Sequence, residues 1–312
     1  MSVGQKLIVG LGELLWDLLP GGKQLGGAPA NFTVMSARLG NDAVIASRTG
    51  SDLLGKEAQA YLAPLPADAT YLQLDPEHAT GTVSVSLRDG QPEYVIHQPV
   101  AWDFMQWTPE WQALAHRADA VCFGTLAQRD PVSRATIHSF LAATSDACLR
   151  VFDVNLREPF YDAHVLESSL QRASLLKLNE IEMPVVLSLL SLVENSGADE
   201  ESLLKGARML LDRFPLLLVC ITMGSQGSLL VTRDAHHRHH GTPTKVADTV
   251  GAGDAFTAAL VRFYLMGASL AVLNEAGNRW GSWVASQHGA MPALSAETYQ
   301  EIEAQIQQAT VQ

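Results

Sequence analysis

Short apolar segments alternate with helical segments along most of this chain, and that alternation constrains the fold more than any other feature. The candidate strands cover residues 6–10, 43–48, 120–124, 150–153, 175–178 and 216–221. Residues 132–143 and 273–288 show the apolar spacing of helices. Alternation of this kind predicts an α/β fold with a parallel sheet, whose functional loops lie at the carboxyl ends of the strands.

One segment breaks the alternation. Residues 82–97 form two runs of alternating polarity, and Asp89-Gly90 between them is a hairpin signal. We expect an antiparallel pair that strands near Trp16 and Gln24 extend into a small sheet. Such a sheet would act as a lid that keeps water from a reacting group. The lid would consist of approximately residues 13–28 and 80–100, inserted in a single domain of residues 1–312.

Residues 248–256 place small side chains and a carboxylate where a helix begins. Gly251, Ala252 and Gly253 let a ligand approach the backbone, and the free N–H groups of a helix N-terminus favour an anion. A transferring phosphoryl group would fit there. The same positive field should keep Asp254 ionised, so that it accepts a proton from an attacking hydroxyl. The alternative is a flexible turn followed by an ordinary helix-terminal aspartate.

A second small-residue turn, at residues 26–31, opens another helix. Asn31 carries both an amide donor and a carbonyl acceptor, the pair that a sugar hydroxyl needs, although it would also serve as a helix cap. Asp17, in the preceding strand, has a carboxylate that can accept from two adjacent hydroxyls. Its alternative is an aspartate that simply faces solvent.

Together these two turns resemble the signatures of the ribokinase-like carbohydrate kinases, the PfkB family. Matching motifs follow in the expected order at residues 12–17, 153–157 and 179–182, so the resemblance covers nearly the whole chain. It is most similar to the fructokinase branch. The resemblance implies a three-layer αβα core with a small β-sheet lid. It also implies ATP-dependent phosphorylation of fructose at its 6-hydroxyl. Kinases for 2-keto-3-deoxygluconate or ribose, and a sugar-binding regulator on the same fold, are the alternatives.

The same resemblance assigns roles to residues. The catalytic anion hole and base would be Gly251, Ala252, Gly253 and Asp254. The sugar would meet Asp17, Gly27, Asn31 and Arg157. For Arg157, pairing with Asp153 or Glu158 is an equally good interpretation. The nucleotide would meet Thr222, Gly224, Gly227 and Asn278.

The resemblance also implies metal ions. Asn179 and Glu182 would order the water shell of Mg²⁺, an ion that keeps most of its waters. The backbone carbonyls of Asp248 and Val250 match a site for K⁺ in many family members. ATP, Mg²⁺ and K⁺ are therefore the expected ligands beside the sugar.

Charge and composition exclude several other functions. With 21 basic and 33 acidic residues the net charge is −12, which argues against binding to nucleic acid or an anionic membrane. Residues 50–57 fall one position short of a P-loop, because Glu57 stands where Ser or Thr must hold magnesium. Lys56 is therefore expected to be an exposed helix residue. Residues 236–240 are rich in histidine, but we expect a polar hairpin tip and not a metal site.

Three widely spaced cysteines, Cys122, Cys148 and Cys220, lie in apolar surroundings. Their odd number and spacing predict reduced core thiols, and no secretion signal precedes the first strand, so a cytoplasmic protein is expected. Trp102 and Trp111 should pack in the core near the lid hinge. Exposed lid edges would need covering, which predicts a homodimer through the lid.

Overall fold

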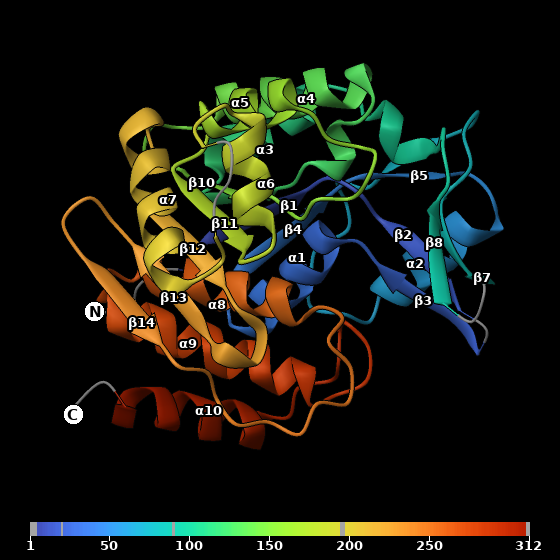
Figure 1. Ribbon diagram of the computed structural model, residues 1–312. Helices are drawn as coiled ribbons and strands as arrows, with labels where there is room; N and C mark the ends of the chain where they lie inside the picture. The colour runs from blue at the N-terminus through green and yellow to red at the C-terminus, as the bar shows by residue number, and fades with distance from the viewer. Residues whose placement is uncertain (1–4, 20, 89–90, 194–196, 310–312) are drawn as a thin grey trace.

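A central sheet of eight strands runs through the computed structural model, which describes residues 5–309 apart from 20, 89–90 and 194–196 (Figure 1). In spatial order the strands are β14 (His236–His239), β13 (Ser228–Val231), β12 (Leu218–Thr222), β11 (Leu175–Asn179), β10 (Leu149–Asp153), β9 (Ala120–Phe123), β1 (Leu7–Leu11) and β4 (Asp42–Ala46). All pairs from β4 to β12 are parallel, whereas β13 and β14 are antiparallel. The predicted parallel sheet is confirmed.

Helices cover both faces of this sheet (Figure 1). One face carries α3 (Pro109–Arg117), α4 (Pro131–Ala143), α5 (Ala163–Leu170), α6 (Glu182–Leu189) and α7 (Glu200–Arg213). The other carries α1 (Ala28–Arg38), α8 (Ala252–Leu265), α9 (Leu270–Ala285) and α10 (Ala296–Ala309). Because strands buried on both faces need apolar residues throughout, their near-continuous hydrophobic sequences fit this position. The three-layer αβα core is confirmed.

A second sheet of four strands lies beside the core, in the order β3 (Gly22–Gly26), β2 (Leu15–Leu19), β7 (Gly81–Arg88) and β8 (Gln91–Ile96) (Figure 1). The β7–β8 pair is antiparallel and β2 and β3 extend it, as predicted. Asp89-Gly90, the expected turn, lies outside the described residues. Trp16 Nε1 donates to the Leu54 carbonyl in α2 (Leu53–Leu62), so the next residue, Asp17, lies on the opposite face of the sheet.

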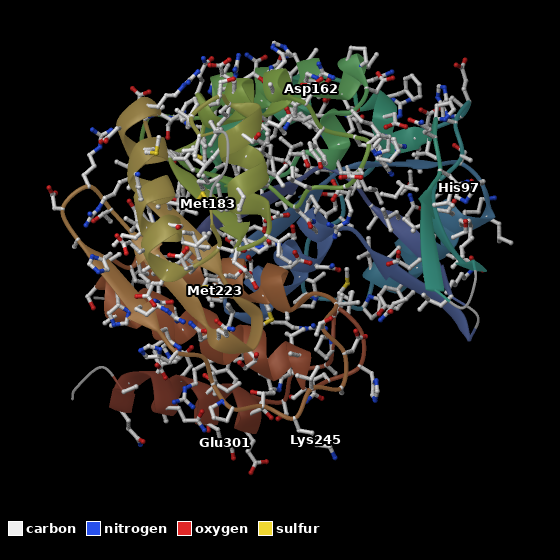
Figure 2. The ribbon with its side chains drawn as sticks, in the orientation of Figure 1. His97, Asp162, Met183, Met223, Lys245 and Glu301 are labelled. Carbon is white, nitrogen blue, oxygen red and sulfur yellow. The ribbon has the colours of Figure 1, made fainter. Side chains whose placement is uncertain are left out.

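The base of the four-stranded sheet is anchored to the core by a buried ion pair. Arg129 Nε lies 2.7 Å from Asp103 Oδ1, and Arg129 Nη2 donates to the carbonyl of His97, directly after β8. Figure 2 shows His97 on this sheet, far from Met183 and Met223 of the core. Trp102, in the short helix η1 (Ala101–Phe104), and Trp111 are fully buried, so their predicted role in core packing is confirmed.

Two expectations about the strands are wrong. The histidine-rich segment is not a hairpin tip: His236–His239 is the edge strand β14, where His237 and His239 contact α9 through Asn274 and Glu275. Residues 43–48 do not form one strand, because the main-sheet strand ends at Ala46 and a separate strand β5 (Arg48–Gly50) pairs with β6 (Gln73–Asp75). Local polarity could not reveal either tertiary pairing.

The expectations for the cysteines and for Lys56 hold. The three cysteines are free and buried. Lys56 is exposed in α2, which Asp52 caps by accepting from the Gly55 N–H. Among the described residues, no helix has both the length and the apolar character needed to cross a membrane.

Candidate active site

Two helix N-termini, those of α1 and α8, come together at the carboxyl end of the sheet. The helices pack against each other, and at neither of them does the N-cap residue provide a side-chain cap. N–H groups of α8 are therefore left for a ligand, whereas the Ala28 N–H of α1 lies against Glu13. Their N-cap residues, Gly27 (φ 109°) and Gly251 (φ 79°), adopt backbone conformations that favour glycine. A Cβ at Gly27 would collide with the Glu13 carbonyl, and one at Gly251 would lie 2.7 Å from the Ala290 Cα.

Asn31 and Asp254, 223 residues apart in sequence, join these two helices. Asn31 Nδ2 donates to Asp254 Oδ2 at 2.8 Å. Asn31 Oδ1 is buried and has no hydrogen-bond partner in the described part of the chain, so it remains free to accept from a ligand. The structure therefore brings together a carboxylate, an amide and the N–H groups of two helix ends.

The pKa of Asp254 is raised to about 6, chiefly by burial and then by the nearby charge of Asp153. Lys177, Asn31 and Arg157 oppose this shift. The sequence predicted that the helix field keeps Asp254 ionised, and burial works against that prediction because desolvation favours the neutral carboxyl. Asp254 is nevertheless mostly ionised at neutral pH, and a pKa near the working pH suits a general base.

Sequence reasoning missed Lys177, which lies directly beside the anion hole. Its Nζ is 3.1 Å from Asp153 Oδ1, and a Cβ at Gly253 would lie 3.1 Å from the same nitrogen. Burial alone would lower the pKa of Lys177, but Asp153, Glu182 and Asp254 outweigh it and raise the pKa, so the ammonium stays charged. A lysine within the apolar strand 175–178 was the signal that could have revealed it.

Asp17 and Arg157 lie close enough for their charges to interact. Burial raises the pKa of Asp17, and the positive charge of Arg157 opposes that shift. Arg157 is exposed, and its Nη1 donates to the Leu156 carbonyl. Within the described residues it forms no ion pair with Asp153 or Glu158, so the structural interpretation of Arg157 finds no support.

The four expected nucleotide residues surround the end of β12. Thr222 is its last residue, and Gly224 (φ 52°) and Gly227 (φ 90°) shape the turn to β13. Asn278 of α9 is buried, and its Nδ2 donates to Ser228 Oγ and to the Asn274 carbonyl, both at 2.7 Å. The structure thus ties Asn278 to the strand that follows this turn.

Asn179 and Glu182 hold the start of α6. Glu182 Oε1 and Oε2 accept from the N–H groups of Leu156 and Asn179, at 2.8 and 2.9 Å. Asn179 Oδ1 accepts from two N–H groups at 2.8 and 2.9 Å. No cluster of three or more His, Cys, Asp or Glu side chains suited to a metal occurs among the residues the structure describes. Since each carboxylate oxygen keeps a second lone pair, the pair suits contact with a metal through water.

Asp248 and Val250 form the turn before α8. Asp248 Oδ1 accepts from the Val250 N–H at 3.0 Å, and Oδ2 accepts from the Gly289 N–H at 3.1 Å. In the described chain, no hydrogen bond occupies the carbonyl oxygens of Asp248 and Val250. Both oxygens therefore remain available to a cation.

Comparison with known proteins identifies the family. A model of the pfkB family of carbohydrate kinases matches residues 21–297. Fructokinase of Escherichia coli is 30% identical over 320 residues, which cover 95% of this chain and 97% of that protein. A putative sugar kinase of Pyrococcus horikoshii is 30% identical over 272 residues, covering 82% of this chain and 81% of that protein.

Solved structures agree. Fructokinase from Vibrio cholerae with bound fructose, ADP and calcium ion matches with a TM-score of 0.78 at 26% identity, over 95% of this chain and 98% of that chain. The Pyrococcus horikoshii kinase in complex with ATP matches with a TM-score of 0.76 at 27% identity, over 91% and 94% of the two chains. The family match, the relatives and the fold agree over most of the sequence, and the chain therefore belongs to the PfkB family of carbohydrate kinases.

Proposed function

We propose that this protein is an ATP-dependent sugar kinase whose acceptor is a ketohexose, with D-fructose phosphorylated to D-fructose 6-phosphate. The observation that carries the proposal is the 2.8 Å hydrogen bond between Asn31 and Asp254, at the meeting point of two uncapped helix N-termini. A base beside an anion-binding backbone is what phosphoryl transfer to a hydroxyl requires. The choice of fructose is supported by relatives named fructokinase and by the fructose-bound Vibrio cholerae structure.

In the proposed reaction, the acceptor hydroxyl oxygen attacks the γ-phosphorus of ATP. The bond from that phosphorus to the bridging oxygen breaks, ADP leaves, and Asp254 takes the hydroxyl proton. The N–H groups around Gly251, Ala252 and Gly253 would stabilise the charge on the transferring group. Lys177 adds a buried ammonium at the same place. The helix N-termini and a bound cation would supply the local positive charge that a chain of net charge −12 needs to bind a polyphosphate.

The substrates would bind on opposite sides of the anion hole. Asp17, Gly27, Asn31 and Arg157 would contact the sugar. Thr222, Gly224, Gly227 and Asn278 would line the nucleotide site. Residues 1–312 would then act as one kinase domain, with the four-stranded sheet as its lid. Gln24 Nε2 of that sheet contacts Gly289, which also bonds to Asp248, so the lid already touches the loop behind the anion hole.

The metal ions would bind at the positions described above. Asn179 and Glu182 would hold waters of Mg²⁺, and when bound this ion would neutralise phosphate charge during transfer. The carbonyl oxygens of Asp248 and Val250 would hold K⁺ behind the anion hole. ATP and a cation are supported by the ATP complex of the Pyrococcus horikoshii kinase and by the ADP and calcium ion in the Vibrio cholerae fructokinase.

We further propose a homodimer through the lid. Leu19 and Val95 on the four-stranded sheet are 40% and 43% exposed, and no strand of the described residues pairs with the outer edges of β3 and β8. A second lid would cover them. Sedimentation equilibrium would give the mass of a dimer, and Leu19→Glu would shift it toward the monomer. A monomer at every concentration would contradict this proposal.

The proposed activity is tested with a panel of acceptors and ATP. Fructose, ribose, tagatose, 2-keto-3-deoxygluconate and adenosine are each assayed for ADP release, and the phosphorylated product is identified by mass spectrometry and NMR. Fructose should give the highest kcat/KM and a 6-phosphate. A higher kcat/KM for another acceptor of the panel would identify that acceptor as the substrate. Sugar binding without any turnover would favour the sugar-binding regulator.

A further inference from the structure

A small pocket lies at the point where the strand order of the main sheet reverses, between β1 and β9. Open α/β sheets bind ligands at such switch points, outside the carboxyl ends of the strands. The cavity volume is about 10 Å³, which is enough for one water molecule or one hydroxyl oxygen. Its polar lining comes from Glu13, Thr125, Asp153 and Asn155.

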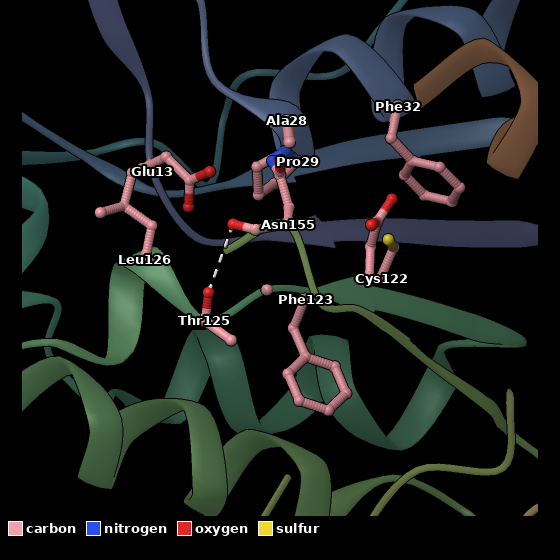
Figure 3. A pocket seen from close by; sticks show the side chains of 11 residues that line it. Glu13, Ala28, Pro29, Phe32, Cys122, Phe123, Thr125, Leu126 and Asn155 are labelled. Carbon is pink, nitrogen blue, oxygen red and sulfur yellow. Dashed lines mark hydrogen bonds between the residues drawn. The ribbon is translucent and has the colours of Figure 1, made fainter. Parts of the chain in front are cut away.

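Glu13 is the unexplained residue of this pocket. Figure 3 shows its carboxyl group pointing toward Pro29 and Asn155. The residue is only 3% exposed, and Oε2 is enclosed without a hydrogen-bond partner in the described residues. Buried polar atoms in native proteins are almost always paired with protein or water, so an unpaired carboxylate oxygen indicates a missing partner.

The backbone of Glu13 packs closely against the start of α1. The residue lies in the short connection between β1 and β2, and its carbonyl packs so closely on Gly27 that a Cβ there would collide. Glu13 therefore stands beside the first turn of α1, the helix that also carries Asn31. Asn31 Oδ1 is likewise buried and unpartnered. Two unpaired acceptor oxygens, Glu13 Oε2 and Asn31 Oδ1, thus lie near the N-terminus of α1.

A structural role alone does not account for these observations. Glu13 lies near enough to the Ala28 N–H to stabilise the N-terminus of α1. That contact leaves Oε2 unpaired. Burial raises the pKa of Glu13 to about 7, and the charge of Asp254 adds to the rise, although its own N–H, the Ala28 N–H and Arg157 oppose it. A carboxyl that is half protonated at neutral pH is a weak helix cap, whereas a hydroxyl donor would stabilise its ionised form.

We propose that Glu13 is a substrate-binding residue whose Oε2 accepts a hydrogen bond from one hydroxyl of the acceptor sugar. This hydroxyl is not the one that is phosphorylated, because Asp254 takes that proton. An acceptor without the matching hydroxyl leaves the carboxylate unpaired in a buried site, so Glu13 contributes to the choice of acceptor. The inference rests on the proposed kinase function and identifies a further residue that recognises the acceptor sugar.

The test is a cycle between Glu13→Gln and a series of acceptors that each lack one hydroxyl. For each acceptor, kcat/KM and the KM for ATP are measured in the wild type and the variant. Glu13→Gln should lower kcat/KM for the full sugar by about 10- to 100-fold, the worth of a hydrogen bond to a charged group, with the KM for ATP unchanged. With the wild type, one deoxy sugar should have a kcat/KM lower than that of the full sugar by this factor. With Glu13→Gln, the same deoxy sugar and the full sugar should have nearly equal kcat/KM.

Glu303→Gln is the matched control. Glu303 lies in α10, away from this pocket, and pairs with Arg262 of α8 at 3.2 Å. The same chemical change at Glu303 should therefore leave the relative kcat/KM values of the acceptors as they are in the wild type. If Glu13→Gln does not fold, Glu13→Asp is carried through the same cycle, because its shorter carboxylate cannot reach the hydroxyl equally well.

The inference is overturned if removing each hydroxyl lowers kcat/KM by the same factor in the wild type and in Glu13→Gln. Loss of a purely structural carboxyl would lower kcat/KM for all acceptors alike. Failure of the proposed function gives a different result. If the wild type phosphorylates no sugar, the binding constants of the same acceptors are measured by calorimetry in place of kcat/KM. Coupling between Glu13 and one hydroxyl would then support the inference, and its absence would refute it.

Discussion

Replacement of Lys177 by methionine tests how the buried charges around Asp254 are balanced. Lys177 Nζ and Asp153 Oδ1 are 3.1 Å apart, and the two side chains are only 11% and 5% exposed. Methionine fills a similar volume but leaves the Asp153 carboxylate buried without its cation. Removing one partner of a buried pair costs about 3–5 kcal/mol, and we expect about 3 kcal/mol here because the site opens toward a ligand.

The same change acts on Asp254. Lys177 lowers the pKa of Asp254 and Asp153 raises it, so the pKa of about 6 should move upward when the ammonium is lost. Because the base must be ionised, activity falls as the pH drops through this pKa. The acidic limb of the pH–rate profile should therefore move to higher pH. At a fixed pH on that limb, activity should be about tenfold lower for each pH unit by which the pKa rises.

Urea unfolding and the pH dependence of kcat/KM measure both effects. The double variant Lys177→Met/Asp153→Asn removes both charges and should recover most of the stability and move the acidic limb back. Lys56→Met, an exposed change in α2, should match the wild type. If Lys177→Met is as stable as the wild type and its acidic limb does not move, Lys177 does not compensate these carboxylates.

Four further predictions concern the site and the lid. Glu182→Gln should raise the Mg²⁺ concentration for half-maximal activity and leave the sugar KM nearly unchanged; an unchanged Mg²⁺ dependence would leave only its structural role. Gly251→Ala should destabilise the protein by about 1–3 kcal/mol in urea unfolding, because φ is 79° there; wild-type stability would refute that strain. Hydrogen exchange in β7 and β8 should slow when fructose is added, and Asp17→Ala should abolish the response; exchange that ignores every productive sugar would exclude lid closure. Asp254→Asn should be about 1–3 kcal/mol more stable than the wild type at pH 8, and the gain should vanish below about pH 4, because folding raises the pKa of Asp254 from 3.8 to about 6; equal stability at pH 8 would contradict this.

Features set by local sequence were predictable. Strand–helix alternation predicted the parallel sheet, and the out-of-pattern hairpin at residues 82–97 predicted the four-stranded sheet. The small-residue turns at residues 26–31 and 251–253 predicted two helix N-termini, and α1 and α8 begin there.

Features set by tertiary packing were not predictable. The position of Lys177 beside Gly253, and the hydrogen bond of Asn31 to Asp254, join segments that only the folded sheet brings together. The upward shift of the Asp254 pKa comes from burial, whereas sequence shows only the helix end that opposes it. Glu13 was visible in a motif, but its unpaired oxygen depends on the pocket formed with α1, β9 and β10.

The measurement that bears most directly on the proposed mechanism is turnover by Asp254→Asn with the best sugar and ATP. Removing a general base should lower kcat by about 10²- to 10⁴-fold, while calorimetry shows sugar and nucleotide binding within a few fold of the wild type. Asn31 can still donate to the new amide oxygen, so the site should keep its shape. Turnover within a few fold of the wild type would show that Asp254 is not the base.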